Sequence, residues 1–143
     1  MTDRPASTTL VPFNTFVVKV ASHCNLNCSY CHMYNLADYT YRDQPATMSP
    51  AVTEAMARRI ADHAFRHSVP WAHVILHGGE PLLIRKRRLR SWVGQVREQT
   101  RGRVAVGFSM QSNGALIDGR MGRSAGRTSG QYRHQHRRSA PLS

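Results

Sequence analysis

Three short strand-like segments alternate with two helix-like segments, and this alternation limits the chain to a small number of folds. The strand-like segments are residues 15–21, 72–77 and 103–110, each rich in apolar residues and free of proline. The intervening segments are long enough to form helices that cross over a sheet, which makes successive strands parallel. The sequence therefore predicts an α/β fold with a parallel sheet, and its 143 residues suit one domain.

The first helix-like segment has a clear start and a clear end. Ser49 supplies an N-cap, Pro50 suits the first helical position, and Pro70 marks the end of the helix. Apolar residues recur at every fourth position, as expected for one face of a helix. These residues are Val52, Met56, Ile60 and Ala64, which we expect to be buried together.

The second helix-like segment begins beside a basic run at residues 85–90 and ends before Gly102. Its apolar residues have helical spacing and are Leu89, Trp92, Val93 and Val96. A basic run of this kind is typical of a solvated helix face, which we favour over a contact with an acidic partner.

A chemically unusual loop follows each predicted strand. Three cysteines follow the first strand, a Gly-Gly-Glu-Pro turn at residues 78–81 follows the second, and a Gln-Ser-Asn-Gly turn at residues 111–114 follows the third. Parallel α/β sheets place their binding sites at the carboxyl ends of the strands. We therefore expect all three loops to share one rim.

The cysteines Cys24, Cys28 and Cys31 lie too close together, and are too few, for an ordinary disulfide framework. Thiolates are the preferred ligands of iron–sulfur clusters, and three of them leave one iron of a four-iron cluster open. A zinc site is the alternative, but it needs a fourth ligand, for which His23 or His32 is the local candidate.

Positive charge is unevenly distributed. The formal net charge is +12, and residues 119–143 contribute six arginines and no acid. Periodicity also ends there, so we expect a disordered basic tail at 119–143, after an N-terminal extension at 1–12 and a folded core at 13–118. The abrupt change in composition suggests that the tail is translated from a shifted reading frame.

Several classes of partner and location are disfavoured. No apolar run reaches the roughly 18 residues of a membrane span, and no secretory signal precedes Leu10, so we expect a cytoplasmic protein. Nucleic-acid binding is also disfavoured, because the tail offers Tyr132 as its single stacking aromatic residue.

Residues 23–31, which read HCNLNCSYC, closely resemble the defining loop of the radical SAM superfamily. The resemblance implies that Cys24, Cys28 and Cys31 hold a [4Fe-4S] cluster and that Tyr30 lies beside the adenine of S-adenosylmethionine. It also implies that the amino and carboxylate groups of this cofactor bind the open iron. One electron from the cluster then cleaves the sulfonium bond and produces a 5′-deoxyadenosyl radical, which abstracts hydrogen from a substrate.

The other two loops resemble further motifs of the same superfamily. The second motif corresponds to Gly78, Gly79, Glu80 and Pro81. This resemblance implies that its backbone and its carboxylate contact the methionine amino group, and paired glycines do allow such a close approach. The third turn resembles a Gln-Thr-Asn-Gly turn of sulfatase-maturase-like members, which implies that Gln111 and Asn113 lie near the cofactor or the substrate. His77, before the glycines, is expected to be a packing or hydrogen-bonding residue at the strand end, and a position facing the cofactor is the alternative.

Residues 13–118 as a whole resemble radical SAM proteins of the SPASM type, which mature peptides and proteins. The fold expected from this is the N-terminal half of a partial (β/α)6 barrel, with about three βα units. The resemblance implies a peptide or protein substrate and an electron donor. The cysteine-rich domain of SPASM members has no counterpart after Cys31, so a catalytically incompetent remnant that retains only cluster or partner binding is the alternative.

Overall fold

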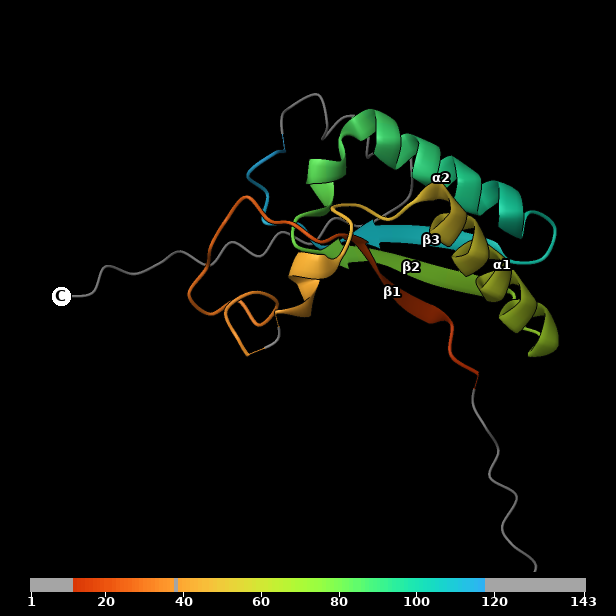
Figure 1. Cartoon of the computed structure of the whole chain (residues 1–143). Helices are drawn as coiled ribbons and strands as arrows, with labels where there is room; N and C mark the ends of the chain where they lie inside the picture. Colours follow the sequence, from red (N-terminus) through yellow and green to blue (C-terminus); the bar gives the residue numbers. More distant parts are fainter. Residues whose placement is uncertain (1–11, 38, 118–143) are drawn as a thin grey trace, which may run out of the picture.

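A parallel three-stranded sheet lies beneath two helices in the computed structural model, which describes residues 12–37 and 39–117 (Figure 1). The elements alternate along the chain as expected, which confirms the α/β class with three parallel strands alternating with helices. Apart from Pro12, the expected N-terminal extension lies outside the described residues, and so does the expected tail.

The strands are β1 (Thr15–Ala21), β2 (Trp71–Gly78) and β3 (Ala105–Met110), and β2 lies between the other two. Both pairings are parallel, with Val17 opposite Ile75 and Ile75 opposite Ser109. The expectation that the third strand begins at residue 103 is wrong. The amides of Arg103 and Val104 bond to the carbonyl of Thr100, which keeps both residues in the turn that closes the preceding helix.

Helix α1 spans Pro50–Arg66, and the Ser49 hydroxyl accepts a hydrogen bond from the Val52 amide at 3.2 Å, as an N-cap does. The expected apolar face is only partly correct. Ile60 and Ala64 are buried and Met56 packs against the core, but Val52 is 53% exposed. The buried residues instead form a wider stripe of Thr53, Ala57, Ile60, Ala61 and Ala64. Small residues allow α1 to lie close to its neighbours, and every-fourth-residue spacing alone does not detect this stripe.

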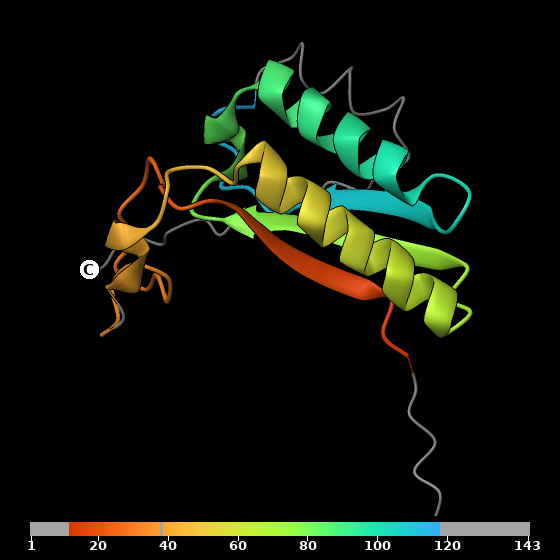
Figure 2. The ribbon, with the colours of Figure 1, turned by 45° about the vertical axis from the view of Figure 1, so that its right-hand side comes forward.

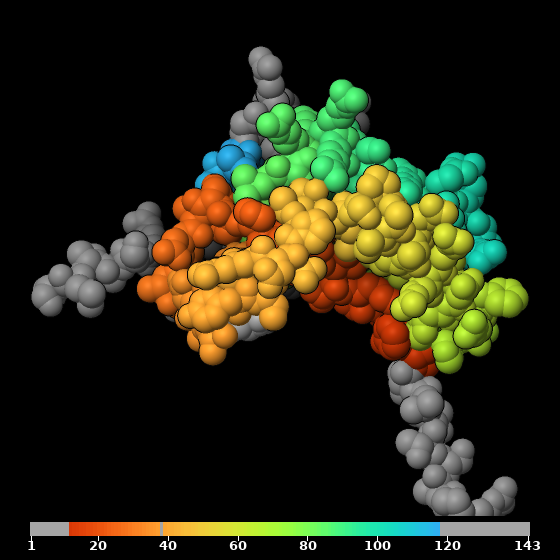
Figure 3. Space-filling model, in the orientation of Figure 1, coloured from red at the N-terminus to blue at the C-terminus, as the bar shows by residue number. Residues whose placement is uncertain are grey.

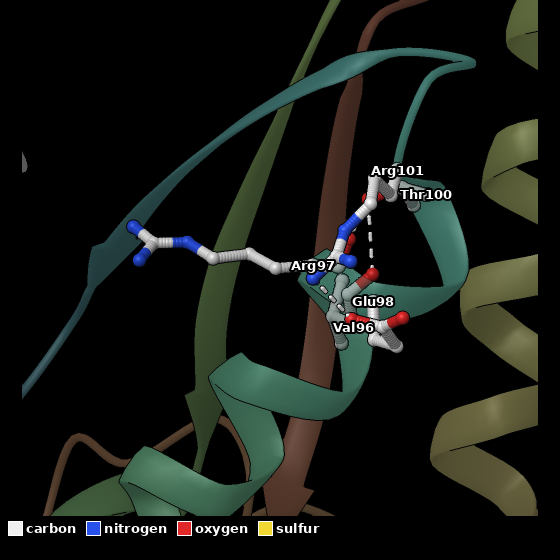
Figure 4. A network of polar contacts seen from close by, with 5 residues as sticks. All are labelled: Val96, Arg97, Glu98, Thr100 and Arg101. Carbon is white, nitrogen blue, oxygen red and sulfur yellow. Dashed lines mark hydrogen bonds and ion pairs between the residues drawn. The ribbon is translucent and has the colours of Figure 1, made fainter.

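Helix α2 spans Lys86–Thr100 after a short 3-10 turn at Pro81–Ile84. Trp92 and Val96 are buried, as expected from their spacing. At its C-terminal end the Thr100 hydroxyl donates to the Val96 carbonyl at 2.9 Å, while Arg97 extends in a different direction (Figure 4). The Arg97 guanidinium lies over the ring of Phe108, which connects the helix to β3.

Both helices cover the same face of the sheet (Figures 1 and 2). Side chains alternate along β2, so Ala72, Val74 and Leu76 are buried beneath the helices. The alternate positions line an open cavity on the other face and are Trp71, His73, Ile75 and His77. The covered face thus supplies the hydrophobic core, and the open face leads to the carboxyl ends of the strands.

The segment between β1 and α1 projects from this body as an orange lobe (Figure 3). It includes a 3-10 turn at Thr40–Asp43, which the sequence did not predict. Its return to the sheet is held by hydrogen bonds from the Ser22 amide to the Ala46 carbonyl and from the Met48 amide to the Val20 carbonyl, both at 3.0 Å. In the described part of the chain, no helix has the length and apolar character needed to cross a membrane.

Candidate functional site

The three unusual loops meet at the carboxyl ends of the strands, around a cavity of about 1010 Å³. The loop after β1 contributes all three cysteines, and the other loops contribute glycines and polar residues. The loop residues on the cavity wall include Cys24, Cys28, Cys31, Gly78, Gly79, Gln111, Ser112 and Asn113. The expectation of a shared rim is therefore confirmed, and it follows from the parallel direction of the strands.

Hydrogen bonds within the loop hold the cysteines in place. The Cys31 amide donates to the Cys28 carbonyl at 2.9 Å, and the Asn35 carboxamide donates to the same carbonyl at 2.6 Å. The Leu26 amide donates to the Cys24 sulfur at 3.4 Å. All three cysteines are free thiols and are partly exposed. Their accessibility and donor chemistry suit a group that enters from the cavity.

An iron–sulfur cluster fits this donor set better than a single metal ion does. Within residues 12–37 and 39–117, no three His, Cys, Asp or Glu side chains are arranged to hold one ion. A four-iron cluster instead engages each thiolate at a different iron, so its ligands are spread around the cluster. Three soft sulfur ligands on one cavity wall meet that requirement.

Gly78 and Gly79 bring the second loop against the first. The Gly79 amide donates to the Ala21 carbonyl at 3.1 Å, and the next amide, that of Glu80, donates to the His23 carbonyl at 2.9 Å. Gly78 has a φ of +131°, which favours glycine. A Cβ atom at Gly79 would lie 2.1 Å from the His23 carbonyl oxygen. The two glycines therefore allow a backbone contact at the start of the cysteine loop.

Glu80 and Pro81 are buried behind this turn, whereas both glycines face the cavity. The Glu80 side chain is 0% exposed, and both of its carboxylate oxygens accept hydrogen bonds. One oxygen accepts from the Leu82 amide and the Ser112 hydroxyl, each at 2.9 Å, and the other accepts from the Asn113 amide at 2.7 Å. The carboxylate thus links the second loop to the third.

The third loop lies against the cysteines. The Gln111 amide donates to the Leu76 carbonyl at 3.0 Å, which extends the pairing of β2 and β3 into the loop. The Asn113 carboxamide donates to the Asn25 carboxamide oxygen at 2.9 Å and to the Cys24 sulfur at 3.7 Å. Tyr30 also borders the cavity and is 84% exposed, so its ring is free to contact a bound molecule.

Sequence reasoning gave three residues of this site another role or none. His77 was expected to be a packing residue and His32 was considered only as a zinc ligand, but both line the cavity. Burial, followed by the proximity of His32 and Lys19, lowers the pKa of His77. Ser112 was part of a recognised turn without a role, and it bonds to Glu80. The alternation of β2 places His77 on the same face as His73, which is the signal that could have identified it.

Tyr34 anchors the cysteine loop and was also not identified. Its hydroxyl donates to the Ser22 carbonyl at 2.8 Å, and its ring packs edge-on against Tyr41 at 4.6 Å between centroids. Burial, and then the thiols of Cys24 and Cys31, raise the pKa of Tyr34 to about 12. The hydroxyl therefore remains a hydrogen-bond donor well above neutral pH.

We expect Tyr34→Phe to lower the free energy of unfolding by about 1 kcal/mol, because one hydrogen bond is lost. The raised pKa also stabilises the parent protein at pH values below 10, and this contribution disappears as the pH rises through about 12. Urea unfolding over this pH range should show a falling stability that Tyr34→Phe flattens. Tyr39→Phe, at an exposed position, is the matched control. A parallel decline in the parent protein and in Tyr34→Phe would contradict the assignment.

Comparison with known families agrees with this geometry. Residues 15–121 match the family described as "4Fe-4S single cluster domain". The chain belongs to this family. It is a radical SAM 4Fe-4S domain, distantly homologous to anaerobic sulfatase-maturating enzymes, so the resemblance inferred from the motifs is confirmed.

Two curated relatives show how low the sequence identity is. The cysteine-type anaerobic sulfatase-maturating enzyme of Clostridium perfringens strain 13 is 28% identical over 107 residues, which cover 75% of this chain and 28% of the relative. The corresponding enzyme of Clostridium novyi strain NT is 26% identical over 98 residues, which cover 68% of this chain and 25% of the relative. The chain thus spans less than a third of the length of these relatives.

Solved structures show the same fold. Native anSMEcpe with bound AdoMet and the Cp18Cys peptide superposes with a TM-score of 0.64 at 23% identity, covering 82% of this chain and 30% of that chain. The complex with AdoMet and the Kp18Cys peptide gives a TM-score of 0.66 at 24% identity over the same shares. The described strands and helices therefore correspond to part of the radical SAM domain of those structures.

Proposed function

We propose that Cys24, Cys28 and Cys31 hold a [4Fe-4S] cluster that binds S-adenosylmethionine, and that the domain serves peptide or protein modification. When bound, the cluster and S-adenosylmethionine supply a 5′-deoxyadenosyl radical by reductive cleavage. The observation that carries the proposal is the meeting of three free thiols with the Gly-Gly turn and the Asn113 loop on one cavity wall.

The residues of this chain have distinct tasks in the proposal. The cysteine thiolates are the cluster ligands, and the glycines at 78 and 79 give the cofactor access to backbone groups at the end of β2. Tyr30 offers an exposed aromatic face for a base. Gln111 and Asn113 supply polar groups beside the cysteines, where they can orient a cofactor or a substrate.

A peptide or protein substrate is supported by the open face of the sheet. The cavity continues from the cysteines along β2 and β3, past Trp71, His73 and Ile75, so it offers an elongated surface of mixed polarity. Solved relatives contain bound peptides as well as AdoMet. The proposal also requires an electron donor, because reduction of the cluster takes one electron from another molecule.

The second candidate function is binding of the cluster or of a partner without turnover. It is favoured by the edge of β3, which in the described part of the chain has no further strand on its outer side. A radical generated at such an open rim lacks the closed surroundings that exclude water and side reactions.

Anaerobic reconstitution separates the two candidates. The protein is supplied with iron and sulfide, purified from excess reagents, and incubated with S-adenosylmethionine and dithionite. We expect about four irons per chain and the appearance of 5′-deoxyadenosine that depends on both additions. A cluster that produces no 5′-deoxyadenosine supports the binding function. A protein that takes up no iron and sulfide contradicts the proposed function and cluster binding, and it leaves partner binding as the remaining form of the second candidate.

A further inference from the structure

Glu80 and Asn113 form a connected pair between the second and third loops. The Glu80 carboxylate accepts the Asn113 amide at 2.7 Å and the Ser112 hydroxyl at 2.9 Å, while its own amide donates to the His23 carbonyl at 2.9 Å. The residue therefore contacts all three loops of the rim. A buried carboxylate fixes the position of a neighbouring loop when it accepts hydrogen bonds from that loop. If these bonds are removed, the loop is free to move.

The carboxamide of Asn113 has one orientation that satisfies its neighbours. Its oxygen accepts a hydrogen bond from the Ala115 amide at 3.0 Å, so its nitrogen must face the other way. That nitrogen lies 2.9 Å from the Asn25 carboxamide oxygen and 3.7 Å from the Cys24 sulfur. With two N–H groups, it can donate to both acceptors at once.

We propose that Asn113 tunes the reduction potential of the cluster by donating an N–H···S hydrogen bond to Cys24, and that Glu80 is the positioning residue that holds Asn113 in place. This inference rests on the proposed function, since it requires a cluster on the cysteines. The cluster takes up one electron from a reductant and becomes more negative. A hydrogen bond to a ligating sulfur stabilises that extra charge and raises the potential.

This role gives the buried carboxylate a purpose other than contact with a ligand. Both oxygens of Glu80 face backbone N–H groups, those of Leu82 and Asn113. Glu80→Gln does not break the bond to Asn113 in every orientation, because its NH₂ group can face the Leu82 amide instead and donate to the Ser112 hydroxyl. Glu80→Met removes both acceptors at similar size and therefore breaks the connection to the third loop.

Potentiometric titration of the reconstituted protein, followed by EPR, tests the tuning role of Asn113. Asn113→Leu removes the N–H donors at similar size and should shift the potential to a more negative value. Asn113→Asp keeps the oxygen that accepts from Ala115 and places a negative charge near the sulfur, so it should shift the potential further. Asn14→Leu is the control and should keep the potential of the parent, because Asn14 is exposed and lies just before β1, at the end of the strand opposite the cysteine loop.

The positioning role of Glu80 is tested in the same titration. Asn113→Leu should shift the potential of the parent but not that of Glu80→Met, because the Asn113–Cys24 hydrogen bond is already lost in Glu80→Met. This comparison cancels the separate effect of removing the negative charge of Glu80. Additive shifts would overturn the positioning role. Parent potentials in both Asn113 variants would overturn the tuning role, while a parent protein that forms no cluster would overturn the proposed function itself.

Discussion

Gly79→Ala is expected to lower the free energy of unfolding by about 3 kcal/mol or more, a large part of the stability of a small domain. A Cβ atom at this position would lie 2.1 Å from the His23 carbonyl oxygen and 2.3 Å from the Tyr34 hydroxyl. The carbonyl belongs to the backbone and also accepts from the Glu80 amide, so it cannot move without breaking that bond. The cysteine loop must then separate from the end of β2. Urea unfolding followed by circular dichroism measures the effect.

Gly94 provides a matched control for the same substitution. It lies within α2, and a Cβ atom there would meet nothing within 4 Å. Gly94→Ala should therefore raise the free energy of unfolding by about 0.5–1 kcal/mol, because alanine has the better helix propensity. If Gly79→Ala were as stable as Gly94→Ala, the close contact between the two loops would be refuted.

Cys28→Ala is expected to reduce the iron and sulfide bound after reconstitution by at least roughly tenfold. Loss of a partner that only supports a ligand costs about 10- to 100-fold in metal affinity, and loss of a ligand costs more. The cysteine is partly exposed and lies outside the hydrophobic core, so before reconstitution the thermal unfolding midpoint should remain close to that of the cluster-free parent. Iron and sulfide analysis and circular dichroism report these two results independently.

Ser29→Ala is the control for the cysteine substitution, since Ser29 is an exposed neighbour in the same loop. It should retain about four irons per chain. Cys24→Ala and Cys31→Ala should behave like Cys28→Ala, because each thiolate binds a different iron. Full iron content in any one of the three alanine variants would remove that cysteine from the ligand set.

Local sequence patterns were sufficient to predict the strands and the two α-helices and their order along the chain, although not the 3-10 turn at Thr40–Asp43. The Ser49 cap, the apolar strand segments and the glycine turns depend on residues near one another in the chain, so they are visible without a structure. The shared rim also followed from the sequence, because parallel strands with helical crossovers place their carboxyl ends on one side. The boundary of β3 did not follow, since it depends on bonds from Arg103 and Val104 to the helix end.

The buried side of α1 shows where spacing was insufficient. Val52 satisfies the every-fourth-residue pattern but is exposed, whereas Thr53 and Ala57 are buried. Which part of a helix is buried depends on how the helix is rotated against the sheet and against its neighbouring helix, and several rotations are compatible with a weak pattern. Tertiary packing therefore decides the rotation of α1, and with it which residues are buried.

The sequence by itself determined the α/β class and located the cysteine loop, because the order of strands and helices along the chain and the position of the thiols follow from residue type and spacing. Only the tertiary structure decided how the three loops are joined. Glu80 lies 33 positions from Asn113 in the chain, and Asn113 lies 89 positions from Cys24. Contacts over such separations arise only once the strands pair and bring their ends together, so no local pattern could have identified them.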